Sequence, residues 1–388
     1  MPRRGLGGDG GIGQQGRLPG PSRAGFARIW VTYVSEMRVT EHLPFKHPTA
    51  RPHARVVAVA LAALAAVVVG CGSSGSANSL TLYSGQHVQT TAALVQAFEK
   101  ATGITVNTRS ADEDTLAAQI STEGSNSPAD VFYTENSPAL EYLQGRGLLS
   151  PVLASTLAAV PAKYSSPQGD WVGVSARVSV IVYNPSRISA SELPTSVMQL
   201  SDPKYKGKLA VAPTETDFQP IVTSVAKTYG DTAAISWLKG IASNAGGRVY
   251  PDNETVVNEV NRGSAALGVI NQYYWYRIRD EIGASNMHAK VAFFASHDAG
   301  YVIDVSGAGV LKSSSHQANA QRFLAFLVSP QAQEIIAHSE SYEYPTAPGV
   351  AASPKEVPLA QLQPNTVSIA DLGDGSTAVS LLRQAGLL

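Results

Sequence analysis

The sequence of 388 residues contains one cysteine, Cys71, so an intrachain disulfide is excluded. Charged residues make up 15% and aromatic residues 7%, against 44% apolar residues, and this balance excludes wholesale disorder, collagen and coiled coil. The net charge of −1 lacks the basic excess typical of nucleic-acid-binding proteins, so we expect no nucleic-acid partner. The sequence also lacks an apolar run of about 20 residues, the length that spans a bilayer.

Motifs of the common enzyme classes are missing as well. The sequence has no G-x-S-x-G, no H-E-x-x-H, no C-x-x-C and no glycine-rich phosphate loop of the usual kind. Carboxylates are plentiful, but no pair is marked out for acid–base catalysis. We therefore predict that the protein is not an enzyme. An exported enzyme and a purely structural lipoprotein are weaker alternatives, and turnover of any substrate would identify the first.

The longest apolar run lies near the N-terminus. Residues 56–70 read VVAVALAALAAVVVG, follow the basic residues Arg51 and Arg55, and end directly before Cys71. A basic flank, a short apolar core and small residues at the end are typical of a secretory signal. V-V-G-C resembles the lipobox of bacterial lipoproteins, which implies that Cys71 is acylated and anchors the mature protein. A buried cysteine in a core helix is the structural alternative.

This interpretation divides the N-terminal part into a leader, residues 1–70, and a flexible tether, residues 71–78, rich in Gly and Ser. Residues 1–36 show no periodicity, whereas Met37 begins a segment suited to a signal peptide. We therefore expect translation to start at or near Met37, with a long natural extension or a disordered tail as alternatives. The predicted location is outside the cytoplasm, on the cell membrane.

After residue 78, short apolar runs alternate with amphipathic stretches, which predicts an α/β architecture. Asn253 is expected to cap the helix that follows it. Expected strands lie at 79–85, 104–110, 129–135, 171–185, 207–218 (running into a loop), 264–275 (running into a polar-aromatic corner) and 300–311. Expected helices lie at 89–102, 114–124, 138–147, 235–243, 254–262 and 315–338, the last broken at Ser329-Pro330.

Three predicted strand ends carry polar residues, and ligands of open α/β sheets bind beyond the carboxyl ends of strands. His87 follows the first strand, Glu135 the third, and the run Asn271-Gln272-Tyr273-Tyr274 the strand near residue 270. Each feature alone has a structural explanation, such as a helix cap or rim packing. Together they predict that a His, a Glu and two Tyr meet at one crevice.

Two phenols, one carboxyl and one imidazole form a hard, oxygen-rich ligand set. Two phenolates and a carboxylate carry three negative charges, which match a trivalent cation. A free Tyr has a pKa of about 10, so a strong positive charge must stabilise the phenolates, and ferric iron provides it. Softer metals prefer thiolates or several imidazoles, while Mg²⁺ and Ca²⁺ prefer carboxylates and carbonyls. Two octahedral positions stay open for water or a small anion.

The segments Y-S-G-Q-H (83–87), S-P-A-D-V-F-Y-T-E (127–135) and I-N-Q-Y-Y-W (270–275) resemble the ferric-ion-binding proteins of bacterial ABC iron importers. The resemblance covers most of 80–345. It implies that His87, Glu135, Tyr273 and Tyr274 hold Fe³⁺, that the protein is a monomer and that an ABC permease is its partner. It also implies a type II periplasmic-binding-protein fold, an α/β fold of two lobes with the ligand cleft between them.

For this fold we place lobe 1 at 79–179 and 304–354, and lobe 2 at 180–303 and 355–388. The hinge strands are expected to cross between the lobes near Arg177–Ile181 and Ile303–Ser306.

One departure concerns the synergistic anion, such as carbonate or phosphate, which better-known family members hold with a Ser-Gly-Ala turn after Pro-Thr. Here Pro213-Thr214 is followed by Glu215-Thr216-Asp217. Three outcomes are open: the anion is carbonate or water, no anion binds, or Glu215 or Asp217 turns inward as an extra ligand or a charge balancer. We favour a retained site with altered anion chemistry. The candidate anion-binding residues are Thr214, Glu215, Thr216, Asn253 and Asn271.

The main alternative keeps the fold but changes the ligand to an organic cation, a sugar phosphate or a ferric chelate. An aromatic-lined cleft suits organic cations. Tyr274→Phe discriminates between the two, because it should cripple iron binding and affect an organic ligand only modestly.

Overall fold

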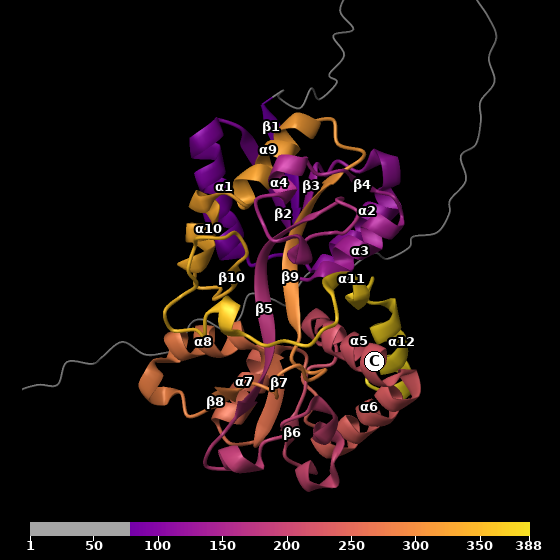
Figure 1. Ribbon diagram of the computed structural model, residues 1–388, viewed down its shortest axis with the longest axis vertical. Helices are drawn as coiled ribbons and strands as arrows, with labels where there is room; N and C mark the ends of the chain where they lie inside the picture. The colour runs from indigo at the N-terminus through magenta and orange to yellow at the C-terminus, as the bar shows by residue number, and fades with distance from the viewer. Residues whose placement is uncertain (1–77) are drawn as a thin grey trace, which may run out of the picture. The chain divides into compact units, whose positions relative to one another are not determined.

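The structure, a computed structural model, describes residues 78–388. The predicted leader and Cys71, with nearly all of the predicted tether, lie outside the described residues. Figure 1 shows strands through the middle of this part of the chain, with helices on both sides of them. Within residues 78–388, no helix is both long enough and apolar enough to cross a membrane.

The described chain opens with strand–helix units. β1 pairs in parallel with both β2 and β3, so the carboxyl ends of these strands share one edge of the sheet. Gly103 ends α1 with a φ of 70°, and the Asp112 carboxylate begins α2 by accepting from the Thr115 N–H at 3.0 Å. The bounds are β1 Ser79–Ser84, α1 Val88–Thr102, β2 Thr105–Ser110, α2 Glu113–Glu123, β3 Val131–Thr134, α3 Ser137–Gly145, β4 Leu149–Ser150 and α4 Ala154–Leu157.

The long strand β5, Val172–Tyr183, is rich in Val and buried along its whole length. Its first part pairs antiparallel with β9, and from Ser179 onward it pairs with β7 instead. This change of neighbour falls inside the predicted crossing at 177–181. β5 therefore connects the part of the sheet that contains β9 with the part that contains β7, and Figure 1 shows it running through both.

Residues 209–292 form the helices α5 to α8, of which α7 and α8 contact β5. The Asp252 carboxylate accepts from the Thr255 N–H at 2.6 Å, so Asp252 caps α7. The predicted Asn253 cap is therefore wrong by one residue, because Asn253 is already the first helical residue. The bounds are β6 Leu209–Ala210, α5 Gln219–Tyr229, α6 Asp231–Ala245, α7 Asn253–Asn261, β7 Leu267–Asn271, α8 Gln272–Ile282 and β8 Lys290–Ala292.

The chain then returns through β9, and the sheet has the strand order β2-β1-β3-β9-β5-β7-β6. The predicted break in the last helical pair is confirmed, because the Ser329 hydroxyl caps α10 and Pro330 begins it. The C-terminal α12 packs against α5 and α6. The bounds are β9 Ile303–Leu311, α9 Gln317–Leu327, α10 Pro330–Ala337, β10 Tyr344–Pro345, α11 Ile369–Leu372 and α12 Ser376–Ala385.

Two clusters of buried apolar side chains hold these elements together. In one, Phe98 of α1 meets Phe323 of α9 edge to face, with ring centroids 5.0 Å apart. In the other, Phe218 stacks on Trp237 of α6, with ring centroids 6.2 Å apart. The α/β architecture is as predicted, whereas the lobe boundaries stay predictions.

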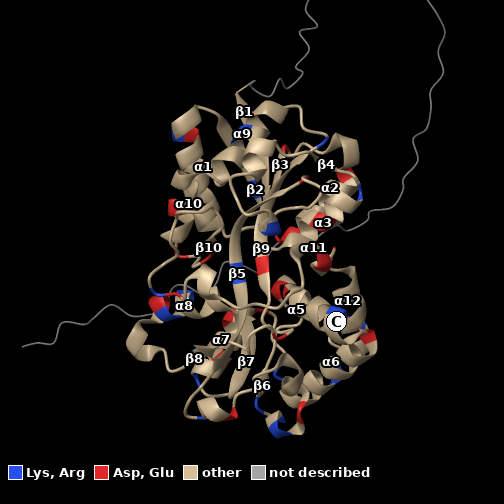
Figure 2. Cartoon of the chain, in the orientation of Figure 1, with Lys and Arg blue, Asp and Glu red and all other residues tan. Residues whose placement is uncertain are grey.

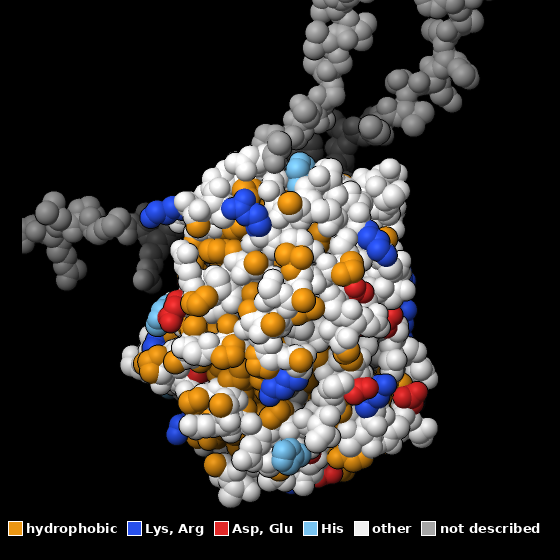
Figure 3. Space-filling model, turned by 45° about the horizontal axis from the view of Figure 1, so that its top comes forward, with side chains coloured by type: hydrophobic (Ala, Val, Ile, Leu, Met, Phe, Trp, Pro, Cys, Tyr) orange, Lys and Arg blue, Asp and Glu red, His pale blue; other side chains and the backbone are white. Residues whose placement is uncertain are grey.

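In the cartoon of Figure 2, most charged residues lie in the helices and loops around the sheet, but blue and red segments also mark charged residues in the middle of β5 and β9. The face in Figure 3 carries few charged side chains among scattered apolar ones. Charge in the interior of such a protein is costly unless it is paired. The charged residues in the middle of β5 and β9 therefore indicate a candidate functional site.

Candidate metal centre

The four predicted ligand residues follow three strands of the sheet. His87 lies between β1 and α1 at the N-cap position, and its side chain makes no capping hydrogen bond. Glu135 lies between β3 and α3. Tyr273 and Tyr274 were expected in a corner after a strand, but they lie in the first turn of α8, directly after β7.

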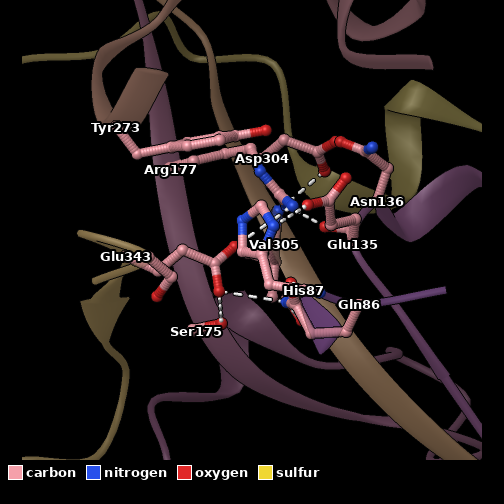
Figure 4. Close-up of polar contacts among 12 residues, drawn as sticks. Gln86, His87, Glu135, Asn136, Ser175, Arg177, Tyr273, Asp304, Val305 and Glu343 are labelled. Atoms are coloured by element: carbon pink, nitrogen blue, oxygen red, sulfur yellow. Dashed lines mark hydrogen bonds and ion pairs between the residues drawn. The ribbon is translucent and has the colours of Figure 1, made fainter. Parts of the chain in front are cut away.

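The structure brings the four side chains together. His87 Nδ1 lies 2.9 Å from Glu135 Oε1. The rings of His87 and Tyr273 meet edge to face with centroids 5.1 Å apart, and those of Tyr273 and Tyr274 pack at 4.1 Å. Figure 4 shows His87, Glu135 and Tyr273 grouped around Arg177. The contacts are continuous from the end of β1 to the start of α8.

Asp217 connects the two tyrosines. Its Oδ2 accepts hydrogen bonds from the hydroxyls of Tyr273 and Tyr274 at 3.0 and 2.9 Å, and from Asn253 Nδ2 at 3.3 Å. Asp217 lies in a single 3₁₀ turn, Thr216–Phe218, just before α5, and is only 4% exposed. The Asp217 carboxylate thus points inward, whereas its predicted role as an extra ligand or a charge balancer stays a prediction.

The imidazole and the carboxyl group stabilise each other's charge. Burial lowers the pKa of His87, but the charge and hydrogen bond of Glu135 outweigh it and raise the pKa above the ordinary value. Burial likewise opposes ionisation of Glu135, yet His87, Arg177 and Arg277 lower its pKa to about 2. Glu135 is therefore an ionised carboxylate at neutral pH, as a hard cation requires.

The two phenols behave in the opposite way. Burial, followed by the negative charges of Asp217 and Glu135, raises the pKa of both Tyr273 and Tyr274 well above the usual value. In this structure they are neutral donors to Asp217. A cation bound between them would have to displace their protons, and a trivalent ion supplies the strongest field for that.

Arg177 of β5 is the central cation of the site. Its side chain is fully buried, and its guanidinium lies 3.1 Å from Glu343 and 3.9 Å from Asp217. It also donates to the backbone carbonyl of Glu135. Glu343 accepts in addition from Ser175 Oγ and Gln86 Nε2, at 2.8 and 3.0 Å. These residues form a buried charged cluster directly beside the candidate ligands.

The sequence predicted a hinge crossing that begins at Arg177, but it did not indicate Gln86 or Glu343 as part of the site. Gln86 was visible in the Y-S-G-Q-H segment next to His87. Glu343 lies near the end of the region 80–345 that resembles the family, and no role was predicted for it. Their partners are far away in sequence, so no local pattern reports the contact.

The structure places the candidate anion-binding residues in different surroundings. Thr214 is exposed and donates to the Pro251 carbonyl at 3.3 Å. Thr216 accepts from Asn136 Nδ2 at 3.1 Å. Burial, together with the charge of Asp217, raises the pKa of the half-buried Glu215 to about 8, so this carboxyl is largely neutral at pH 7. Asn271 is buried at the N-cap position of α8 without a capping hydrogen bond.

The donor set fits a hard metal ion only when the tyrosines are counted. In residues 78–388, no group of three or more His, Cys, Asp and Glu side chains is placed to hold a metal. The ring atom His87 Nε2 and the carboxylate atom Asp217 Oδ1 are both buried without a hydrogen-bond partner. Buried polar atoms normally have partners, so two orphans beside two phenols indicate a ligand position.

Comparison with known proteins identifies the family. The model of the bacterial extracellular solute-binding proteins matches residues 126–367. The Fe(3+)-binding periplasmic protein of Serratia marcescens is 37% identical over 84% of this chain and 96% of its own length. The major ferric iron-binding protein of Neisseria meningitidis is 38% identical over 79% and 93%.

Solved structures agree with these relatives. Iron-bound HitA from Pseudomonas aeruginosa is 42% identical and superimposes with a TM-score of 0.75, covering 80% of this chain and 99% of its own. The Trichodesmium protein solved with iron and citrate is 30% identical, with a TM-score of 0.71, over 80% and 100%. The fold is that of the type II periplasmic binding proteins, and the chain belongs to the bacterial extracellular solute-binding proteins.

Proposed function

We propose that this protein captures Fe³⁺ outside the cytoplasm and delivers it to an ABC permease, with His87, Glu135, Tyr273 and Tyr274 as the protein ligands. The observation that carries the proposal is the continuous contact of these four side chains, which come from three separate strand ends. Relatives that span most of the chain are ferric-binding proteins by name, which supports the choice of metal.

The charges favour Fe³⁺ over a divalent ion. Glu135 is ionised. Each of the two phenols can release its proton to the solvent when a trivalent ion takes the place of that proton. The resulting carboxylate and two phenolates balance the ion. His87 adds a nitrogen ligand once it too has released to the solvent the proton that Glu135 stabilises on its ring. A divalent ion would leave one excess negative charge on ligands that are largely withdrawn from water, which is costly.

An organic cation is less well accommodated. Such ligands bind over the open faces of aromatic rings. Here Tyr273 and Tyr274 pack against each other at 4.1 Å, and His87 covers Tyr273 from the side. The faces that the two phenol rings turn toward each other are thus already occupied by protein.

The test is a visible absorption spectrum of the purified protein before and after ferric citrate is added. Phenolate bound to Fe³⁺ gives an orange to red charge-transfer band that the protein alone cannot produce. The colour should appear in the natural protein and be lost in the double variant Tyr273→Phe/Tyr274→Phe. Tyr276→Phe is the matched control, because Tyr276 lies on the same helix but stacks on Tyr342 at 5.2 Å instead.

A folded protein that stays colourless, or a double variant that keeps the colour, would contradict direct coordination by the tyrosines. In the first case the ligand would be an organic or chelated molecule on the same scaffold. Equal loss of colour in Tyr276→Phe would show that the helix, rather than the phenols, had been disturbed.

We also propose that acylated Cys71 anchors the protein to the membrane, which rests on the lipobox-like segment before it. Cys71→Ala should move the protein from the membrane fraction to the soluble fraction of cells. An unchanged distribution would refute the anchor. We further propose a monomer with the lobe boundaries stated above, joined where β5 leaves β9 for β7.

A further inference from the structure

Glu113, the first residue of α2, directs its carboxyl group to the end of β3. The start of α2 already has its cap, because the Asp112 carboxylate accepts from the Thr115 N–H. The Glu113 side chain is buried, with only 3% of it exposed. A carboxyl group is costly to bury unless its oxygens have hydrogen-bond partners, so the partners of Glu113 indicate what it does.

These partners lie on both sides of the predicted iron ligand Glu135. Oε2 of Glu113 accepts from the Asn136 backbone N–H at 2.8 Å and from the Thr134 hydroxyl. Oε1 accepts from Asn136 Nδ2 at 2.8 Å. Thr134 and Asn136 are themselves buried. A single side chain therefore holds the residue before Glu135 and the residue after it.

The stem of Glu113 also packs against the backbone that leads to His87. A Cβ added at Gly85 would lie 2.5 Å from Glu113 Cβ, so a side chain at this position would force the two segments apart. The Gly85 N–H donates to the Tyr133 carbonyl at 2.8 Å, which joins the ends of β1 and β3. Glu113 thus lies between the segments that carry His87 and Glu135, and His87 Nδ1 is 2.9 Å from Glu135 Oε1.

We propose that Glu113 is a positioning residue for Fe³⁺ capture, which sets the geometry of the His87–Glu135 pair by holding the ends of β1 and β3 together. This inference rests on the proposed iron site. Residues that orient metal ligands without touching the ion typically control its affinity. Burial, followed by the negative charge of Glu135, raises the pKa of Glu113 well above its usual value. Its carboxyl group therefore acts through shape and hydrogen bonds rather than through charge.

The experiment compares two buried carboxyl groups at opposite ends of β3, in titrations with ferric citrate followed by the charge-transfer colour. Glu113→Ala should bind iron on the order of tenfold more weakly, and its absorption maximum should shift because the other donors of the ion have moved. Asp130→Ala is the matched control. Asp130 lies before β3, is 2% exposed, and accepts from the Thr81 N–H at 2.7 Å and the Ser314 hydroxyl at 2.6 Å. This control should lower the melting temperature but keep the affinity and the absorption maximum.

Two further variants examine how Glu113 acts. Glu113→Gln keeps the length of the side chain, and Asn136 Oδ1 has no hydrogen-bond partner among the described residues. The Asn136 amide can therefore turn and accept from the new amide nitrogen, so we expect the affinity and the absorption maximum of the natural protein. Thr134→Val removes one hydrogen bond at nearly constant shape and should weaken iron binding roughly threefold, which keeps the test open if Glu113→Ala does not fold. Circular dichroism verifies the fold of each variant.

The outcomes separate the two proposals. If Glu113→Ala binds iron as tightly as Asp130→Ala, with an unchanged absorption maximum, Glu113 serves stability alone, and its positioning role is refuted while the tyrosine site stands. Binding by Glu113→Gln that is as weak as that of Glu113→Ala would also overturn this role, because the charge of the group would then matter. If the natural protein gives no colour, the proposed iron site fails, and the role of Glu113 with it.

Discussion

Glu356 makes the stability of this protein depend on pH in an unusual direction. Its side chain is buried near the start of α8, where Oε1 accepts from Gln272 Nε2 at 3.3 Å and Oε2 has no partner. Burial, reinforced by the charge of Glu343, raises the pKa of Glu356 to about 8 from 4.5. The folded protein therefore holds a proton that the unfolded chain releases above about pH 4.5.

Proton linkage gives the sign and the size of this pH dependence of stability. Where the folded state binds more protons, stability falls as pH rises. The contribution of Glu356 is complete below pH 4.5 and is lost progressively up to about pH 8. One pKa unit corresponds to about 1.4 kcal/mol, so the protein should lose about 3 to 4 kcal/mol between pH 5 and pH 8 through this group.

Glu356→Gln keeps the shape of the protonated side chain and removes its titration. We expect the variant to match the natural protein at pH 5 and to be about 3 to 4 kcal/mol more stable at pH 8, a rise in melting temperature of roughly 5–10 °C. Calorimetry of iron-free protein at both pH values measures this. Glu340→Gln, at an exposed position, is the matched control. An equal change in melting temperature between pH 5 and pH 8 for natural protein and Glu356→Gln would refute the assignment.

Two further predictions concern the buried strand β5. Gly173→Ala should destabilise the protein by about 3 kcal/mol or more in thermal unfolding, because the new Cβ would overlap the Tyr164 carbonyl oxygen. Gly145→Ala is the control, because a Cβ at Gly145 meets open space and should have little effect. Similar melting temperatures for the two variants would contradict this prediction. Arg177→Met should cost about 3 to 5 kcal/mol because it leaves buried carboxylates uncompensated, and adding Glu343→Gln should recover part of the loss. A double variant no more stable than the single one would show that pairing is not the cause.

The parts of the site that could be predicted from sequence are those written in local patterns. An apolar run followed by Gly85 ends a strand, and a polar residue just beyond it, such as His87, lies at the sheet edge whatever the rest of the chain does. The same reasoning placed Glu135. The parallel pairing of β1 with β3 then brings both to one edge, so the predicted encounter needed only the α/β pattern.

Other features depend on contacts that local patterns do not record. The segment QYYWYRIRDEI is rich in aromatic residues with strand preference, so α8 was read as a corner after a strand. Asp252 and Asn253 are both good caps, and only packing decides which one is used. The inward direction of Asp217 is set by Tyr273, Tyr274 and Asn253, which lie more than 30 residues away in sequence.

Arg177 explains why the binding residues and the crossing strand belong to one unit. It lies on β5 one residue before Val178, the last position paired with β9. From there it holds the Glu135 carbonyl after β3, the Asp217 carboxylate before α5 and the Glu343 carboxylate beside β10. A cation between Glu135 and Asp217 competes with this guanidinium for the same negative charge. Because a guanidinium stays charged when buried, we expect binding to change its pairing with Asp217 and Glu343 rather than its protonation. We therefore expect the occupancy of the candidate site to be coupled electrostatically to the position where β5 changes neighbours.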